Sequence, residues 1–388
     1  MPGIAPRAIL FDLLTALLDS WTLWERAAGS EDGGRRWRAE YLRRTYGAGD
    51  YVPYDELVRA SAEATGVSSA AVSELSSAWE TLAPWPDVAM TLRRLPRSLS
   101  LGVVTNCSYV LGRQAAAIVE RAMGRPLDVI VTAEEAGAYK PDPRPYRAAL
   151  AALQYAPHDV LFVAGSPSDL GGAAGVGMPI VWHNAIGVRR PETQPVPLAE
   201  GRSLAATLHA VGVGDGITLR IATGSDARAV AELAAETFRD TYGDNHNPAL
   251  VEQYIAAHFS VRETTRVLED PTTTVVVLEA PDGTLLGYYV WRAQPLPPGS
   301  TVTARRPCEL VRIYLRKTRH GGGLGSSLLR DAMDRTRAAD GDLLWLSVWQ
   351  HNAQAISFYQ RLGFAHAGET IFDFFGEPED DFVMARRT

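Results

Sequence analysis

Five short apolar runs in the first half of the chain constrain its fold more than any other feature. They are residues 8–11, 100–105, 129–132, 160–164 and 179–182, and helix-like segments separate them. Short, continuous apolar runs that alternate with helical segments are typical of parallel strands covered on both faces. The sequence therefore predicts an α/β fold with a parallel sheet in this half.

The chain of 388 residues is longer than one ordinary domain, which favours two domains. About 85 residues of mostly helical pattern separate the first two apolar runs, far more than a crossover needs, so we expect an inserted helical cap over about residues 20–97. A glycine-rich piece at residues 212–216 precedes a new strand-and-helix pattern. We therefore predict domains at residues 1–211 and 217–388.

Composition excludes several classes of protein. The formal net charge of −7 argues against nucleic acid as the main partner, because phosphate binding needs clustered Lys and Arg. Cys107 and Cys308 form neither a disulfide framework nor a metal-ligand spacing, which favours a reducing, cytoplasmic location. The sequence shows no secretory signal and no apolar run of about 18 residues, so we expect no membrane partner.

Polar residues suited to covalent catalysis follow four of the predicted strands. Asp12, Thr105-Asn106, Lys140 and Asp169 lie at or just beyond strand ends, where reactive groups collect in open α/β sheets. A carboxylate can act as a nucleophile, and a nearby ammonium group keeps it ionised. The alternative reading is that each residue is an ordinary polar side chain in a turn.

The same segments resemble the haloacid dehalogenase-like hydrolases over about residues 7–190. The matching motifs are Phe11-Asp12, Val104-Thr105-Asn106, residues 139–146 and residues 162–177. Tyr146 stands six residues after Lys140, as in the L-2-haloacid dehalogenase branch. The resemblance implies a Rossmann-like core in which an aspartate attacks carbon and water then hydrolyses the aspartyl ester. The residues it assigns to catalysis are Asp12, Arg38 of the cap, Thr105, Asn106, Lys140, Tyr146 and Asp169.

Three positions depart from the family pattern. Leu14 stands where the phosphatase branches have a second Asp, and an apolar side chain neither transfers a proton nor binds a metal. We therefore expect no metal in this domain. Ala164 and Ser166 replace a Ser and an Asn of the dehalogenase branch, which leaves open both the substrate and a catalytically silent domain.

A glycine-rich loop at residues 319–325 opens a predicted helix in the second half. Glycines let backbone N–H groups converge on a phosphate, and a helix N-terminus adds partial positive charge. Residues 346–364 follow with Asn352 and Phe358-Tyr359. Together the two segments are similar to the GNAT acetyltransferases, and the resemblance covers about residues 217–388.

The GNAT resemblance implies acetyl-CoA as cofactor. The residues it places around the cofactor are Ile313, Tyr314 and Leu315 along the pantetheine arm, His320, Gly321, Gly323, Leu324, Gly325 and Ser326 around the pyrophosphate, and Asn352. Tyr359 would protonate the CoA thiolate, unless it is only a packed aromatic residue. Glu309 is the best candidate for the base, unless it is an ordinary solvated carboxylate.

Residues 237–242 and 309–315 look like the bacterial polyamine acetyltransferase subgroup, which implies a primary amine as acceptor. Family analogy also allows a homodimer. The leading interpretation is a bifunctional enzyme, an N-acetyltransferase of a small amine or amino acid fused to a dehalogenase-like hydrolase. Two alternatives stay open: the first domain is a substrate-binding or docking module, or the second is a CoA-binding regulator.

Overall fold

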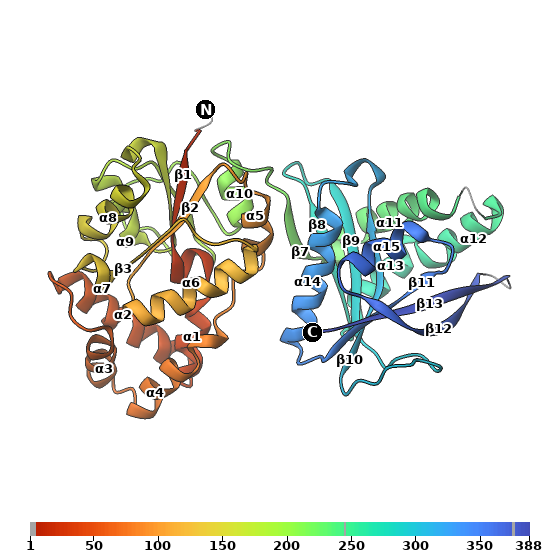
Figure 1. Cartoon of the computed structure of the whole chain (residues 1–388), viewed down its shortest axis with the longest axis horizontal. Coiled ribbons are helices and arrows are strands. Elements are labelled where there is room, and N and C mark those ends of the chain that lie inside the picture. The colour runs from red at the N-terminus through yellow and green to blue at the C-terminus, as the bar shows by residue number, and fades with distance from the viewer. Residues whose placement is uncertain (1–4, 244–245, 375–376) are drawn as a thin grey trace. The chain divides into compact units, whose positions relative to one another are not determined.

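The computed structural model describes residues 5–243, 246–374 and 377–388. The chain divides into two compact units, Met1–Thr218 and Leu219–Thr388, called here the first and second unit. Each has its own sheet and its own buried core, and Figure 1 labels most of their helices and strands.

The first unit contains a six-stranded parallel sheet in the order β3-β2-β1-β4-β5-β6, as predicted for this half. Its strands are β1 (Ala8–Asp12), β2 (Ser100–Thr105), β3 (Val129–Thr132), β4 (Val160–Ala164), β5 (Ile180–His183) and β6 (Glu200–Gly201). All residues of β1 and β4 are buried, which explains why they appear in the sequence as continuous apolar runs. The two-residue strand β6 was not predicted.

Helices cover this sheet, and Asp12 passes directly into a π-helix at Leu13–Leu17. The helices that follow the later strands are α6 (Tyr109–Met123), α7 (Ala133–Ala136), α8 (Pro143–Leu153), α9 (Pro167–Gly175) and α10 (Leu204–His209). Short 3-10 turns lie at Trp79–Thr81 and Pro157–Asp159.

The segment between β1 and β2 is helical, as expected for a cap. It consists of α1 (Ser20–Ala27), α2 (Glu31–Gly47), α3 (Tyr54–Thr65), α4 (Ser69–Ser77) and α5 (Val88–Arg94). Its core is aromatic: Trp24 and Trp37 meet edge to face with ring centroids 4.6 Å apart. Trp79 donates a 3.0 Å hydrogen bond from its indole nitrogen to the carbonyl of Leu111 on α6, which ties the cap to the core.

The second unit has a seven-stranded mixed sheet in the order β12-β13-β11-β10-β9-β8-β7. Its strands are β7 (Thr218–Ile221), β8 (Thr273–Glu279), β9 (Leu285–Ala293), β10 (Pro307–Leu315), β11 (Leu343–Trp349), β12 (Ala365–Phe374) and β13 (Glu377–Arg387). Neighbours β10 and β11 are parallel, whereas β9 and β13 run antiparallel to them. The pairing of β10 with β9 shifts between Leu310 and Arg312, where the strand is irregular.

The helices of the second unit are α11 (Ala227–Tyr242), α12 (Pro248–His258), α13 (Val261–Glu269), α14 (Leu324–Ala338) and α15 (Ala353–Arg361), with 3-10 turns at Gly224–Asp226 and Lys317–Arg319. Gly323, with a φ of 78°, precedes the first residue of α14. That left-handed conformation is one that side chains other than glycine adopt at a cost. The sequence therefore starts α14 with a tight glycine turn.

Candidate active sites

The Asp12 carboxylate is held from two sides at the carboxyl end of β1. Its Oδ2 atom accepts hydrogen bonds from the backbone N–H groups of Thr15 at 2.8 Å and Ala16 at 3.3 Å, and from the Thr15 hydroxyl. Its Oδ1 atom accepts a 2.7 Å hydrogen bond from Nζ of Lys140. Burial acts to raise the pKa of Asp12, but the charge and the hydrogen bonds of Lys140 and Thr15 outweigh it and hold this pKa below its ordinary value. Asp12 is therefore ionised at neutral pH.

Lys140 is fixed through its backbone by Asn106. The side-chain amide of Asn106 donates to the carbonyl of Lys140 at 3.0 Å, and its oxygen accepts from the Lys140 N–H at 2.7 Å. The lysine is 2% exposed, and its Nζ atom also lies 3.0 Å from Oδ1 of Asp169. Burial acts to lower the pKa of Lys140, but Asp12 and Asp169 raise it above its usual range. The ammonium group thus bridges two carboxylates.

Asp169 lies in the first turn of α9 and is surrounded by hydroxyl groups. Its Oδ1 atom accepts from the Tyr146 hydroxyl at 3.2 Å, and its Oδ2 atom accepts from Ser166 at 3.1 Å. Burial and the nearby charge of Asp12 raise the pKa of Asp169, against the opposing effects of Lys140 and Ser166. The two carboxylates therefore differ in proton affinity, which suits one to attack and the other to accept a proton.

Serine side chains extend this network to the cap. Ser166 and Ser168 share a 2.9 Å hydrogen bond, and the Tyr46 hydroxyl of α2 is hydrogen-bonded to Ser168. Thr105 stands apart from the carboxylates, since its hydroxyl donates to Sγ of Cys107 at 3.6 Å. Burial raises the pKa of the Cys107 thiol to about 12, so this cysteine is an unreactive thiol at neutral pH.

Arg38 of α2 is a buried cation without a counter-ion among the described residues. It is 5% exposed, and its Nη1 atom has no hydrogen-bond partner in the described part of the chain. The guanidinium lies over the ring of Trp21, 3.9 Å from the ring centroid. Burial lowers the pKa of Arg38, and Asp12 exerts the largest opposing electrostatic effect. A buried, unpaired guanidinium is suited to bind an incoming anion.

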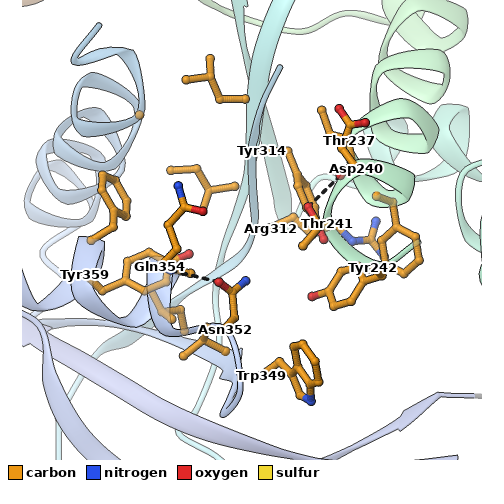
Figure 2. Close-up of a pocket in the computed structure, with 18 of the residues that line it drawn as sticks. Thr237, Asp240, Thr241, Tyr242, Arg312, Tyr314, Trp349, Asn352, Gln354 and Tyr359 are labelled. Atoms are coloured by element: carbon orange, nitrogen blue, oxygen red, sulfur yellow. Dashed lines mark hydrogen bonds between the residues drawn. The ribbon is translucent and has the colours of Figure 1, made fainter. Parts of the chain in front are cut away.

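The second unit contains a cavity of about 970 Å³. Figure 2 shows its wall, with Thr237 and Tyr242 of α11 on one side and Asn352 and Tyr359 on the other. Of the residues that the sequence places around a cofactor, those that line this cavity are Ile313, Tyr314, Leu315, His320, Gly321, Gly323, Gly325, Ser326 and Asn352. Leu324 points into the core, where it is 3% exposed. The structure thus gathers the glycine loop, β10 and the start of α15 around one space.

Tyr359 and Asn352 contribute differently to this cavity. Burial raises the pKa of the Tyr359 hydroxyl above its ordinary value, so the hydroxyl keeps its proton at neutral pH. Asn352 caps α15, because its Oδ1 atom accepts a 3.0 Å hydrogen bond from the N–H of Ala355 (Figure 2). The Asn352 oxygen is therefore already engaged, and its amide nitrogen is the group left to face the cavity.

Glu309 lies outside the cavity, in contrast to the expectation that it serves as the base. Its Oε2 atom accepts a 2.6 Å hydrogen bond from Nε of Arg292 on the neighbouring strand β9, with which it also forms an ion pair. It is not among the described residues that line the cavity. Its position at the start of a strand did not reveal which way the side chain faces.

Two family models match the chain, one in each unit. The model described as haloacid dehalogenase-like hydrolase matches residues 7–177, and that of the acetyltransferase (GNAT) family matches residues 228–364. An uncharacterised N-acetyltransferase of Mycobacterium bovis is 30% identical over 164 residues, which are 42% of this chain and 97% of that protein. An (S)-2-haloacid dehalogenase of Pseudomonas putida is 28% identical over 211 residues, 50% of this chain and 93% of that protein.

The chain joins a haloacid dehalogenase-like hydrolase domain to a GNAT acetyltransferase domain. The crystal structure of the PaiA N-acetyltransferase of Thermoplasma acidophilum in complex with coenzyme A is 23% identical, with a TM-score of 0.35, and covers 44% of this chain and 99% of that one. Within the described residues, no helix is long and apolar enough to span a membrane.

The sequence analysis assigned no role to several residues that line the acetyltransferase cavity, among them His246, Trp349, Glu379 and Asp381. Nε1 of Trp349 donates to Oε2 of Glu379 at 2.6 Å, and Nε2 of His246 lies 3.2 Å from the other oxygen of Glu379. The signal in the sequence was the acidic run Glu379-Asp380-Asp381, which lies within β13, and that signal does not distinguish a solvated turn from a cavity wall.

Proposed function

We propose that the acetyltransferase domain transfers the acetyl group of acetyl-CoA to the primary amine of a small molecule or amino acid. The cavity of about 970 Å³ carries this proposal, because the glycine loop and the protonated Tyr359 hydroxyl face the same space. When bound there, acetyl-CoA supplies the acetyl group as a reactive thioester.

The glycine loop fits a pyrophosphate group. Gly321 and Gly323 have φ values of 82° and 78°, and a side chain at either position would project into open space. Gly323 provides no side-chain cap for α14, so the N–H groups of the first turn, from Leu324 to Ser326, are available to phosphate oxygens. The positive end of the helix also favours the negative charge.

Tyr359 supports the departure of the thiolate. A hydroxyl that keeps its proton at neutral pH can transfer it to sulfur as the carbon–sulfur bond breaks. The test is release of CoA from acetyl-CoA over a panel of polyamines, amino acids and halogenated amino acids, before and after Tyr359→Phe. Turnover of one acceptor class that falls in the variant supports the proposal. Absence of turnover with every acceptor, despite CoA binding, would instead favour a CoA-binding regulator.

We further propose that the hydrolase domain displaces a leaving group from carbon 2 of a small carboxylate, with Asp12 as nucleophile and without a metal. The observation that carries this proposal is the buried, unpaired Arg38 near the ionised Asp12. An Asp12 oxygen forms a bond to carbon, and the leaving group departs as an anion toward Arg38. Water then adds to the carboxyl carbon of the aspartyl ester, Asp169 accepts its proton, and a 2-hydroxy acid leaves.

A single turnover in heavy-oxygen water tests this step, with a 2-haloalkanoate as substrate. Hydrolysis of an aspartyl ester leaves one heavy oxygen in the peptide that contains Asp12, which mass spectrometry detects. Asp12→Asn should remain unlabelled. Binding of the carboxylate without labelling would instead favour a docking module that delivers substrate to the acetyltransferase. Labelling together with acetylation of one amino-bearing compound would support a bifunctional enzyme that acts on a single metabolite.

A further inference from the structure

Asp381 is a buried acid in the wall of the acetyltransferase cavity. It lies on β13, opposite Trp349 of β11 and Thr370 of β12, and is 7% exposed. Successive side chains of a strand point to opposite faces, and the preceding residue, Asp380, is exposed. The sheet therefore directs the carboxyl group of Asp381 into the cavity and that of Asp380 away from it.

Hydroxyl groups and acids surround Asp381, and Arg312 of β10 lines the same cavity. No Lys, Arg or His forms an ion pair with it in the described part of the chain. The groups that interact with Asp381 by charge or by hydrogen bonding are Tyr242 of α11, Tyr314 of β10, Ser347 of β11, and Glu379 and Asp380 of its own strand. Burial and the two acids raise the pKa of Asp381 to about 6, while Ser347 opposes them. A carboxylate of this basicity is poised to accept a proton near neutral pH.

Two other titratable groups of this wall, His246 and Glu379, contact each other, and the cavity is also lined by Asp240, Arg312, Lys317, His320, His351 and Arg361. Nδ1 of His246 lies 3.2 Å from the carbonyl oxygen of Tyr242, and its Nε2 lies 3.2 Å from Glu379. Because both ring nitrogens face oxygen acceptors, the imidazole has no lone pair directed at a substrate. Glu379 in turn accepts from the indole of Trp349 with its second oxygen. Asp381 is thus the buried carboxyl group of the described wall that is open to a new partner.

We propose that Asp381 is the catalytic residue that accepts a proton from the acceptor amine, an inference that rests on the proposed acetyltransferase function. The acceptor enters as an ammonium ion, which the carboxylate attracts. A carboxylate oxygen of Asp381 takes one ammonium proton and leaves a neutral amine with a free lone pair. The nitrogen then bonds to the thioester carbon, the carbon–sulfur bond breaks, and Tyr359 gives its proton to the sulfur. The second nitrogen proton goes to water, from which Tyr359 is reprotonated.

The experiment compares wild type with Asp381→Asn, Asp381→Glu and Asp380→Asn, using the amine that wild type turns over best. We measure kcat/KM over roughly pH 5 to 9 for each protein, together with the Kd for CoA. We expect an acidic limb in the wild-type profile with a midpoint near pH 6, the value to which the pKa of Asp381 is raised. Asp381→Asn should lose at least about 100-fold in kcat/KM, the usual contribution of general base catalysis, and should lose this limb.

Two controls separate catalysis from folding. An unchanged Kd for CoA shows that Asp381→Asn folds, and partial recovery with a shifted limb in Asp381→Glu shows that the carboxylate itself matters. Asp380→Asn should retain the plateau kcat/KM and the acidic limb, because this side chain faces away from the cavity, with the midpoint of the limb moved only slightly lower by loss of a charge that helps to raise the pKa of Asp381. Two results would overturn this inference and leave the acetyltransferase proposal intact. One is wild-type kcat/KM with an intact acidic limb in Asp381→Asn. The other is loss of the acidic limb in Glu309→Gln rather than in Asp381→Asn. A wild type that turns over no amine would overturn the acetyltransferase proposal and this inference together.

Discussion

Lys140 donates a 2.7 Å hydrogen bond to Oδ1 of Asp12, a residue 128 positions earlier in the chain. The same ammonium group lies 3.0 Å from Asp169, so one buried cation separates two buried carboxylates. Breaking such a pair from one side leaves an uncompensated charge in a medium of low dielectric constant. Lys140 therefore stabilises the buried pair of carboxylates and also shifts their pKa values.

Replacement of Lys140 by Met should destabilise the hydrolase domain by about 3–5 kcal/mol at pH 7. Lys140 holds the pKa of Asp12 down, so its stabilising effect is present above the unfolded pKa of the carboxyl group and is lost as the pH falls through the folded value. The loss of unfolding free energy in Lys140→Met should therefore become smaller as the pH falls. Urea unfolding at several pH values, followed by a probe within the first unit, measures it. An equal loss at every pH would contradict this account.

Replacement of Arg38 by Gln should have opposite effects on stability and activity. Without ligand, removal of a buried and unpaired cation should raise the unfolding free energy by about 1–3 kcal/mol. Hydrolysis of a 2-haloalkanoate should fall by about 100-fold in kcat/KM, because the substrate carboxylate loses its buried partner. Arg36→Gln is the matched control, since Arg36 lies on the same helix with a side chain that is 65% exposed. Loss of stability in Arg38→Gln would show that its stacking on Trp21 dominates.

Replacement of Gly323 by Ala should weaken CoA binding. The φ of 78° costs a residue with a Cβ atom about 1–2 kcal/mol, so the loop is expected to relax away from the geometry that binds phosphate. The corresponding loss of affinity is about tenfold, which titration calorimetry can measure. Gly322→Ala serves as the control, because the backbone of Gly322 is not left-handed. Equal affinities of the two variants would argue against a role for the glycine turn.

Replacement of Asp381 by Asn should stabilise the acetyltransferase domain at alkaline pH. The folded pKa of about 6 lies above the unfolded value near 3.9, so the stability associated with the protonated form is lost as the pH rises through 6. The amide carries no charge and avoids this loss. We expect the variant to gain on the order of 3 kcal/mol at pH 8 and roughly half of that at pH 5, which thermal unfolding at both values can check. A gain that does not depend on pH would contradict the assignment.

Hydrophobic patterning predicted the secondary structure near both sites well. The glycine loop at 319–325 and the apolar run after it predict a helix over 324–338 and a strand over 343–349, and both elements have those bounds in the structure. The sequence also predicts a strand over 365–375; the observed strand β12 ends at Phe374, and Phe375 lies outside the described residues. Helix α13 was not predicted, since its short segment is rich in Thr, Arg and Glu and only Thr264 is buried.

Side-chain direction was harder to predict. Asp12, Lys140 and Asp169 meet because parallel strands end at one edge of a sheet, a rule that applies without coordinates. Glu309 lies near the start of β10 and Asp381 within β13, and in these strands of a mixed sheet a shift of one residue reverses the face. Strand β10 carries such an irregularity between Leu310 and Arg312. Motif spacing therefore located the hydrolase residues but not the acid of the acetyltransferase cavity.

Arg38 belongs to the cap and Asp12 to the sheet, and both are buried. The proposed hydrolysis therefore predicts that α2 moves away from the sheet to admit a carboxylate and returns before any bond changes. Solvent friction then contributes to the turnover rate of the hydrolase domain. A viscous medium should lower this rate even where the bond changes are fast. In that case movement of the aromatic cap, rather than bond breaking, limits the rate.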